Sequence, residues 1–418
     1  MMINNALTGV LDFAGASERL SKVVKKIPLE YNERLSKRYQ CNVFLKREDL
    51  QIVRSYKIRG AYNMMSALSP EERKRGVVCA SAGNHAQGFA YSCKAMQIKG
   101  VVFMPIVTPN QKVSQVSMFG EEWVEIKLVG DTFDDCAAAA KKYTEEHNMV
   151  FIPPFDHPKI IEGQGTVGVD IYRELPEIEY LFIPIGGGGL ASGTGIYFKT
   201  YSPKTKLIGV EPAGAPSMLK AFEAGHPVTL KEIDRFVDGA AVKRVGDLTY
   251  SICKEVLDKV HTVEEGKVCS TILKLYNENA IVVEPAGALS VAALDDFADE
   301  IKGKNVVCII SGSNNDIDRM QEIRERSLFY EGLKHYFMIR FFQRPGALKQ
   351  FVNEVLGPDD DITRFEYIKK INKESGPALV GIELKNKKDY EKLIQNLEKY
   401  NISYTEINKD NNLFGHMV

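Results

Sequence analysis

Short apolar runs that end in small, glycine- or serine-rich segments recur along most of the chain, and they constrain its fold more than any other feature. Helix-like stretches such as residues 133–147 and 266–278 separate the runs. Continuous apolar strands that alternate with helices are typical of parallel sheets buried on both faces. The sequence therefore predicts an α/β fold over residues 1–325. The apolar runs are residues 77–80, 100–104, 181–185, 207–210 and 306–310.

Size and composition limit the classes of function. A chain of 418 residues is longer than one core usually supports, so we expect at least two domains. The 54 basic and 55 acidic residues balance, which gives no field to attract nucleic acid or an anionic membrane. Seven cysteines without a C-x-x-C pair indicate reduced thiols and a cytoplasmic protein. There is no signal-peptide pattern, and no apolar run approaches the roughly 20 residues that span a bilayer.

The C-terminal part has a different pattern. Its order of strand, helix, strand, strand, helix and strand is that of a ferredoxin-like α+β unit. Topology alone leaves two interpretations open, a dimerisation appendage without a ligand and a regulatory module. We therefore expect a catalytic domain at 1–325, a linker at 326–334 and a second domain at 335–418. The six expected elements are residues 335–341, 347–356, 362–368, 378–384, 388–400 and 403–407.

Lys57 stands where a β-rich segment gives way to the helix-like run 61–65. Most lysines near the start of a helix are solvated surface charges. A lysine that leaves water there can lose its proton and attack a carbonyl group. Residues 81–88, 186–190 and 311–314 follow strand-like runs as well. Because ligands of open α/β sheets bind beyond the carboxyl ends of strands, we predict that the four segments form one pocket.

The four consecutive glycines at 186–189 are weak evidence by themselves. No Gly-Lys-Ser/Thr follows them, so they are not a P-loop, and the G-x-G-x-x-G fingerprint is absent from a first βα turn. One interpretation is a plain tight turn. The other is a loop whose exposed N–H groups bind a phosphate at the start of a helix. A phosphate loop together with a lysine suited to imine chemistry suggests pyridoxal phosphate.

Taken together, the stretches S-Y-K-I-R-G, S-A-G-N-H-A-Q-G, G-G-G-G-L and S-G-S-N resemble fold-type II (tryptophan synthase β-like) pyridoxal-phosphate enzymes, most closely the threonine dehydratase (threonine ammonia-lyase) group. The resemblance covers most of residues 20–320. It implies that Lys57 is the Schiff-base lysine and removes the α-proton, and that Tyr56 packs against the cofactor. It also implies a phosphate loop of Gly186, Gly187, Gly188, Gly189 and Leu190.

The same resemblance assigns roles to two other segments. Ser311 would bond the pyridine nitrogen, and its neutral hydroxyl favours loss of a β-substituent over transamination. Asn84 would reach the phenolic oxygen of the cofactor. His85 could in principle be a base or metal ligand, but no second ligand stands at suitable spacing, so we expect a positioning role and no metal. The loop that would hold the substrate carboxylate is Ser81, Ala82, Gly83, Asn84 and His85.

The implied reaction is β-elimination from L-threonine, with L-serine as a secondary substrate, giving 2-oxobutanoate and ammonia. The cofactor phosphate is our hypothesis for the acid that protonates the leaving hydroxyl. Related serine racemases have S-S-G-N-H at the carboxylate loop, and the second serine returns a proton on the face opposite the lysine. Ala82 has no proton to give at this position, which predicts little racemisation. Residues 211–217 resemble the start of a cation-binding loop of relatives. Ser217 stands where those relatives have an aspartate, which puts a bound cation in doubt. Glu284 resembles a glutamate near the cofactor, although a packing role is equally open.

Residues 344–348, 361–367 and 376–381 resemble the ACT-like regulatory domain of biosynthetic members, present here as one copy. This implies isoleucine as feedback inhibitor, valine as a second candidate effector, and a homotetramer that catalyses the first step of isoleucine biosynthesis. Two alternatives stay open. One is an L-serine-preferring dehydratase, because one methyl group is worth only about 1–3 kcal/mol. The other is a non-catalytic amino-acid-binding regulator.

Overall fold

The computed structural model describes residues 11–367 and 374–408, which form two compact units. The first unit contains the described residues up to Glu265 together with Lys274–Asp316. The second contains Gly266–Leu273 and the described residues from Ile317 onward. The boundary expected at residue 325 falls within helix α15 (Met320–Glu331). The domain limits therefore stay a prediction.

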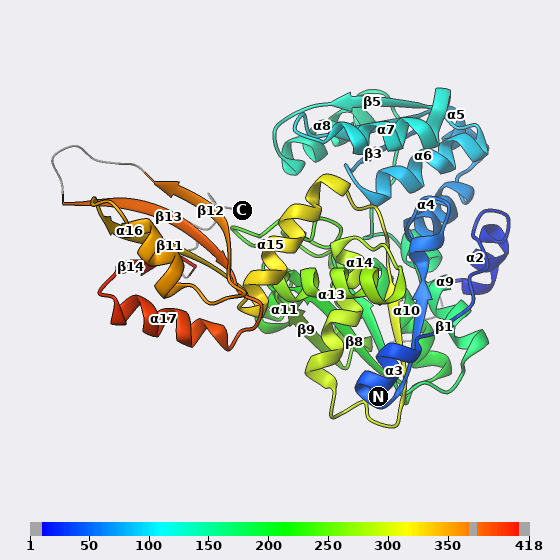
Figure 1. Cartoon of the computed structure of the whole chain (residues 1–418). Helices are drawn as coiled ribbons and strands as arrows, with labels where there is room; N and C mark the ends of the chain where they lie inside the picture. The colour runs from blue at the N-terminus through cyan, green and yellow to red at the C-terminus, as the bar shows by residue number, and fades with distance from the viewer. Residues whose placement is uncertain (1–10, 368–373, 409–418) are drawn as a thin grey trace. The chain divides into compact units, whose positions relative to one another are not determined.

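A six-stranded sheet forms the larger half of the first unit (Figure 1). The strand order is β1-β2-β10-β7-β8-β9, and every neighbouring pair except β1 and β2 is parallel. The parallel arrangement confirms the prediction from the apolar runs, while the short antiparallel edge strand was not predicted. The strands are β1 (Glu30–Tyr31), β2 (Asn42–Arg47), β7 (Tyr180–Pro184), β8 (Lys206–Pro212), β9 (Lys259–Val263) and β10 (Asn305–Ile310).

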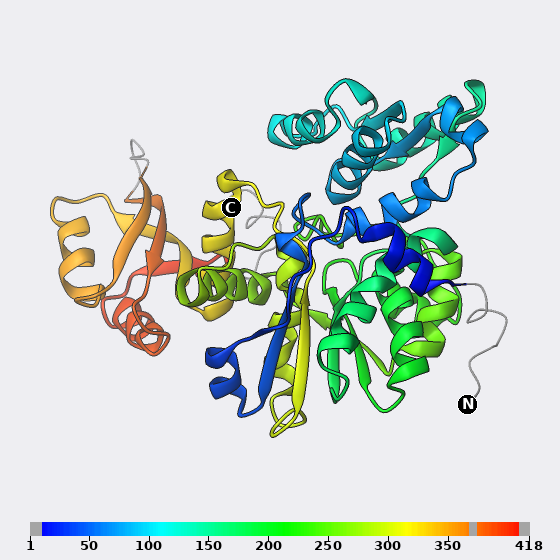
Figure 2. The same ribbon diagram turned by 90° about the vertical axis from the view of Figure 1, so that its right-hand side faces the viewer.

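A smaller, wholly parallel sheet of order β5-β4-β3-β6 forms the other half of this unit. In Figure 2 its light-blue to cyan elements make a body beside the one around the larger sheet. The strands β3 and β4 are buried along their whole length, as their unbroken apolar sequences predict. The strands are β3 (Val77–Ala80), β4 (Gly100–Met104), β5 (Val124–Leu128) and β6 (Val150–Phe151).

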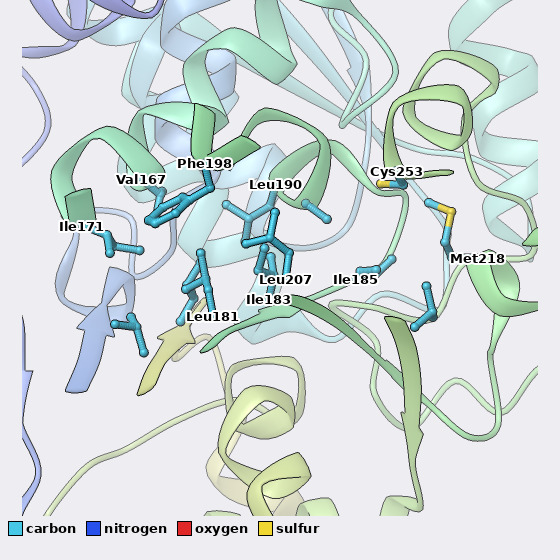
Figure 3. Packing of buried hydrophobic residues seen from close by; sticks show 14 of the residues in the cluster. Val167, Ile171, Leu181, Ile183, Ile185, Leu190, Phe198, Leu207, Met218 and Cys253 are labelled. Atoms are coloured by element: carbon cyan, nitrogen blue, oxygen red, sulfur yellow. The ribbon is translucent and has the colours of Figure 1, made fainter. Parts of the chain in front are cut away.

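Helices α9 (Pro158–Glu174) and α10 (Gly189–Tyr201) cover one face of the larger sheet. Figure 3 shows Val167 and Ile171 of α9 and Phe198 of α10 above Leu181 and Leu207 of the strands. All five side chains are fully buried. Burial of apolar surface stabilises by roughly 25 cal/mol per Å², so this core fixes the ends of the strands and helices around it.

The helices of the first unit differ in how they begin. Helix α8 (Phe133–Glu146) has a capping box, in which Thr132 and Asp135 satisfy each other's backbone N–H groups. Helices α6 (Asn84–Met96) and α10 begin after Gly83 and Gly188, and neither has a side-chain cap. Their first N–H groups are therefore available to a ligand.

The described part of the second unit has the expected order of strand, helix, strand, strand, helix and strand, in an antiparallel sheet β12-β13-β11-β14. The first helix is shorter than the expected 347–356 and ends in a π-helical turn, η5. Residue 368, the expected end of the second strand, lies outside the described residues. The elements are β11 (Lys334–Phe342), α16 (Ala347–Gln350), η5 (Phe351–Val355), β12 (Asp361–Tyr367), β13 (Ser375–Glu383), α17 (Asp389–Lys399) and β14 (Ser403–Glu406).

Among the described residues, no helix is both long and apolar enough to cross a lipid bilayer. The remaining helices are α2 (Phe13–Leu20), α3 (Glu33–Tyr39), α4 (Lys57–Ser66), α5 (Pro70–Arg75), α7 (Asn110–Gly120), α11 (Ser217–Ala224), α12 (Asp247–Val256), α13 (Glu265–Asn279) and α14 (Pro285–Ala292). The short 3-10 helices are η1 (Glu48–Leu50), η2 (Glu121–Trp123), η3 (Ala293–Phe297) and η4 (Ile317–Arg319).

Candidate active site

Lys57 is the first residue of α4, and the segment before it pairs with the segment that follows β10. The Tyr56 N–H donates to the Ser311 carbonyl at 3.2 Å, and the Ser313 N–H donates to the Arg54 carbonyl at 2.9 Å. Because β10 is a central strand, this pairing fixes the start of α4 at the carboxyl edge of the larger sheet. The first and fourth sequence motifs therefore lie side by side.

The Lys57 side chain is partly buried and points to the chain between β6 and α9. Its Nζ donates to the Pro154 carbonyl at 2.9 Å and lies 5.4 Å from the centre of the Tyr56 ring. Burial lowers the pKa of Lys57 to about 8, although the nearby Glu284 carboxylate opposes this shift. A lysine with this pKa has a substantial neutral, nucleophilic fraction near neutral pH.

The loop that begins at Ser81 meets Glu284, which lies just before α14. The Asn84 Nδ2 donates to Glu284 Oε1 at 2.6 Å, and the Asn314 N–H donates to Glu284 Oε2 at 3.1 Å. Burial, followed by the charge of Asp238, raises the pKa of Glu284 to about 7. The second and fourth motifs are thus joined through one buried carboxylate. The amide donor that the sequence suggested for a cofactor oxygen is used by Glu284 in this arrangement.

His85 is buried in the first turn of α6. Its Nε2 lies 2.9 Å from the Ile152 carbonyl, and its Nδ1 is buried without a hydrogen-bond partner. Burial, together with the charge of Lys57, lowers the pKa of His85 to about 3, so the ring is neutral. The carbonyl at Nε2 requires the proton on that nitrogen, which leaves Nδ1 as an acceptor.

The glycine loop lies between β7 and α10, and its shape requires residues without a Cβ. Gly188 has a φ of +93°, and the Gly187 carbonyl accepts a bond from Thr249 Oγ1 at 2.7 Å. A Cβ on Gly187 would overlap the Phe155 ring. The Leu190 side chain packs in the core of the larger sheet (Figure 3), so only its backbone can face a ligand.

Phe155 connects this loop to Lys57, because Pro154, whose carbonyl accepts the lysine bond, precedes it in the chain. The structure thus brings together the four sequence motifs, which are spread over more than half of the chain. The roles of their residues in binding remain predictions.

Buried polar atoms without a partner surround this cluster. Asn84 Oδ1, His85 Nδ1 and Gln164 Oε1 are acceptors that no protein group satisfies. Such atoms are costly unless a ligand or water supplies donors. Pyridoxal phosphate fits these features: the uncapped start of α10 suits its phosphate, and Lys57 suits its aldehyde. The uncapped start of α6 would then suit the carboxylate of a bound amino acid.

The side chains of Glu211 and Ser217 make hydrogen bonds within the protein. Glu211 accepts bonds from the N–H groups of Met218 at 2.7 Å and Leu219 at 2.9 Å, and the Ser217 hydroxyl donates to the Val242 carbonyl. Within residues 11–367 and 374–408, no group of three or more His, Cys, Asp or Glu could hold a metal ion. The expectation of a metal-free enzyme stays a prediction.

Comparison with known proteins identifies the family. Residues 20–312 match the family of pyridoxal-phosphate-dependent enzymes, and residues 325–417 match the C-terminal regulatory domain of threonine dehydratase. The biosynthetic L-threonine dehydratase of Halalkalibacterium halodurans is 59% identical over 97% of this chain and 98% of its own length. The biosynthetic L-threonine dehydratase of Bacillus subtilis is 57% identical over 100% of this chain and 99% of its own length. The chain belongs to the biosynthetic L-threonine dehydratases.

The same assignment follows from a solved structure. Threonine deaminase isoform 2 from Solanum lycopersicum superposes with a TM-score of 0.74 and 39% identity, over 78% of this chain and 94% of that one. The protein is accordingly a pyridoxal-phosphate-dependent lyase of fold-type II, with a regulatory domain at its C-terminal end.

Sequence reasoning missed part of this dehydratase site. Pro154 and Phe155 were not predicted, and neither was Gln164, whose Nε2 donates to the Pro154 carbonyl at 3.3 Å. Glu284 was noticed, but a packing role was left open. The available signal for Gln164 was a polar residue between two glycines, Gly163 and Gly165, in the middle of α9.

Proposed function

We propose that this protein deaminates L-threonine to 2-oxobutanoate and ammonia, the first step of isoleucine biosynthesis. The observation that carries the proposal is Lys57, a partly buried lysine of lowered pKa in a site that also contains two uncapped helix starts and unpartnered acceptors. Full-length similarity to biosynthetic L-threonine dehydratases supports the choice of substrate.

Lys57 has two tasks in this proposal. It holds the cofactor covalently before substrate arrives, and once displaced it takes the proton from the substrate Cα. Bound pyridoxal phosphate supplies the electron withdrawal that makes this proton acidic. The Cα–H and Cβ–O bonds break, and the hydroxyl takes up one proton and leaves as water, which balances the proton that Lys57 removes from Cα. The released enamine takes up water to give the keto acid and ammonia.

Ser81, Ala82, Gly83, Asn84 and His85 would hold the substrate carboxylate at the start of α6. A carboxylate is favoured there because the first N–H groups of the helix carry partial positive charge. His85 is unsuited to protonate the leaving hydroxyl, since its pKa is about 3 and its Nε2 faces the Ile152 carbonyl. We therefore assign it a positioning role.

The cofactor would be held by the phosphate loop and by two side chains. The N–H groups of Gly186, Gly187, Gly188, Gly189 and Leu190 would receive the phosphate, Ser311 would bond the pyridine nitrogen, and Tyr56 would pack against the ring. Phe155 lies so close to Gly187 that a Cβ on Gly187 would overlap its ring. A loop that must have glycine here keeps its backbone exposed, which supports this assignment.

Regulation is proposed for the C-terminal domain at 335–418, with isoleucine as inhibitor and valine as second candidate effector. The match to the regulatory domain of threonine dehydratase supports an amino-acid effector. We also propose a homotetramer, through which effector binding could favour one arrangement of subunits. A cytoplasmic location is supported by seven buried cysteines, none in a disulfide.

The experiment is release of 2-keto acid from L-threonine and from L-serine by the protein loaded with pyridoxal phosphate, with and without isoleucine. We expect a higher kcat/KM for L-threonine and suppression by isoleucine. Lys57→Ala should abolish turnover. The control Lys199→Ala, which removes a lysine of α10 that pairs with Asp258, should not. Turnover by Lys57→Ala, or none by the parent protein, would contradict the proposal.

A further inference from the structure

Two side chains share the carbonyl oxygen of Pro154. Lys57 Nζ donates to it at 2.9 Å, and Gln164 Nε2 donates to it at 3.3 Å. A carbonyl oxygen has two lone pairs, so this one is fully used. Pro154 follows another proline and lies in the irregular segment between β6 and α9. The bond from Gln164 therefore helps to fix the direction of this oxygen, which the bond from Lys57 alone would not do.

Gln164 is held in place by close packing. It lies in α9 with 1% of its surface exposed, and a Cβ on Gly60 of α4 would come within 3.0 Å of its side chain. A Cβ on Gly189, the first residue of α10, would overlap its Oε1. Gln164 therefore touches the helix that carries Lys57 and the helix that begins at the phosphate loop.

The Oε1 of Gln164 is buried and has no hydrogen-bond partner. An amide that only filled space would be replaced at lower cost by an apolar side chain, because a buried acceptor without a donor is unfavourable. Its other end makes a bond to the carbonyl that receives Lys57. The Nε2 of Gln164 thus bonds the carbonyl that also binds the Lys57 amine, and its Oε1 is an acceptor without a partner in the same site.

We propose that Gln164 is a positioning residue for Lys57, acting through the Pro154 carbonyl. The inference rests on the proposed function of Lys57 as cofactor-binding lysine and base, and it deepens that function. When the amine is free, the fixed carbonyl accepts one of its N–H bonds. One fixed N–H restricts the rotation of the amine, so its lone pair is presented in a limited set of directions.

A purely structural role makes different predictions. If Gln164 only fills the space between α4, α9 and α10, leucine, which has nearly the same size, should replace it without any effect on Lys57. If it positions Lys57, leucine should disturb the amine even in a well-folded protein. Glutamate should do so in another way, because it places a carboxylate close to the ammonium group.

The test measures the capture of pyridoxal phosphate by cofactor-free protein, followed as visible absorbance over a range of pH, for the parent protein, Gln164→Leu and Gln164→Glu. We expect Gln164→Leu to lower the capture rate at high pH by about tenfold, because the amine is misdirected. We expect Gln164→Glu to raise the pH midpoint of capture by about one unit or more, since an opposite charge nearby favours the ammonium form.

The matched control is Thr205→Val. It removes a buried hydrogen bond to the Ile178 carbonyl at the opposite, amino edge of the larger sheet. It should lower the thermal unfolding temperature while leaving capture rate and midpoint unchanged. If Gln164→Leu behaves like this control, or if Gln164→Glu leaves the midpoint unchanged, the inference is overturned.

This result is separable from the proposed function. If the parent protein captures pyridoxal phosphate but releases no keto acid from L-threonine, the proposed function fails, while the capture data still decide the role of Gln164. If turnover proceeds and the Gln164 variants capture the cofactor normally, only the positioning role is wrong.

Discussion

Lys57 and Arg59 are two residues apart in the first turn of α4, but their surroundings are opposite in kind. Arg59 is buried, and two carboxylates accept three of its N–H bonds: Glu48 accepts two at 2.7 and 2.8 Å, and Asp170 accepts one at 2.7 Å. Thr166 Oγ1 accepts the bond from the remaining guanidinium nitrogen at 3.0 Å. Lys57 has one carbonyl as its acceptor.

The pKa directions follow this difference. Burial lowers the pKa of Lys57, whereas the two carboxylates around Arg59 outweigh its burial and raise its pKa. The raised pKa keeps Arg59 charged. Its bonds to Glu48 of η1 and to Asp170 and Thr166 of α9, here called the closed cluster, fix α4 against these two elements. The surroundings of Lys57, here called the open side, leave an amine that can react. One helix turn therefore combines a structural ion cluster with a site that leaves polar atoms for a ligand.

The largest effect is expected from breaking the closed cluster. Arg59→Met would leave the fully buried Glu48 without a cation, which typically costs about 3–5 kcal/mol of unfolding free energy. Denaturant unfolding would measure the loss. The double variant Glu48→Gln with Arg59→Met should recover part of it, because the uncompensated carboxylate is gone. An Arg59→Met protein as stable as the parent would show that the cluster is not structural.

A smaller effect of opposite sign is expected on the open side. Lys57→Met should stabilise the cofactor-free protein by about 1–3 kcal/mol at pH 7, because a desolvated ammonium is removed. The folded pKa of about 8 lies below the unfolded value of 10.5, so the unfolded state binds more protons between these values. Parent stability should therefore rise with pH across this window.

The measurement is denaturant unfolding of both cofactor-free proteins at several pH values. The advantage of Lys57→Met should shrink from pH 8 upward and vanish above about pH 10.5, where the lysine is neutral in both states. A variant less stable than the parent at pH 7 would mean that Lys57 is a stabilising pair partner, and the contrast with Arg59 would be lost.

The smallest effect is expected at the rim of the closed cluster. Thr166→Val removes one acceptor from the Arg59 guanidinium and one donor from the Gly163 carbonyl, which should cost about 1–2 kcal/mol. Thermal unfolding would show the loss, and cofactor capture at Lys57 should stay unchanged. A changed capture rate would show that the two sides of α4 are coupled.

Much of the site could be predicted from the sequence because its signals are local. The glycine loop, Lys57 and Ser311 each follow an apolar strand run, and parallel strands place such positions at one edge. The contacts between the motifs could not be predicted. Glu284 and Asn84 are 200 positions apart, and no local pattern pairs them. Nor could the sequence show that the Leu190 side chain packs in the core, which leaves only its backbone N–H for the predicted phosphate loop.

The sequence by itself determined the fold class and, through the resemblance of its motifs, the cofactor and the reaction. Periodicity and local motifs depend on neighbours in the chain, so they can be read without coordinates. Only the tertiary structure decided that the Pro154 carbonyl receives Lys57, that Gln164 shares it, and that Arg59 is closed in a cluster. Such pairs depend on how separate helices and strands pack, and a buried polar residue in one helix does not specify its distant partner.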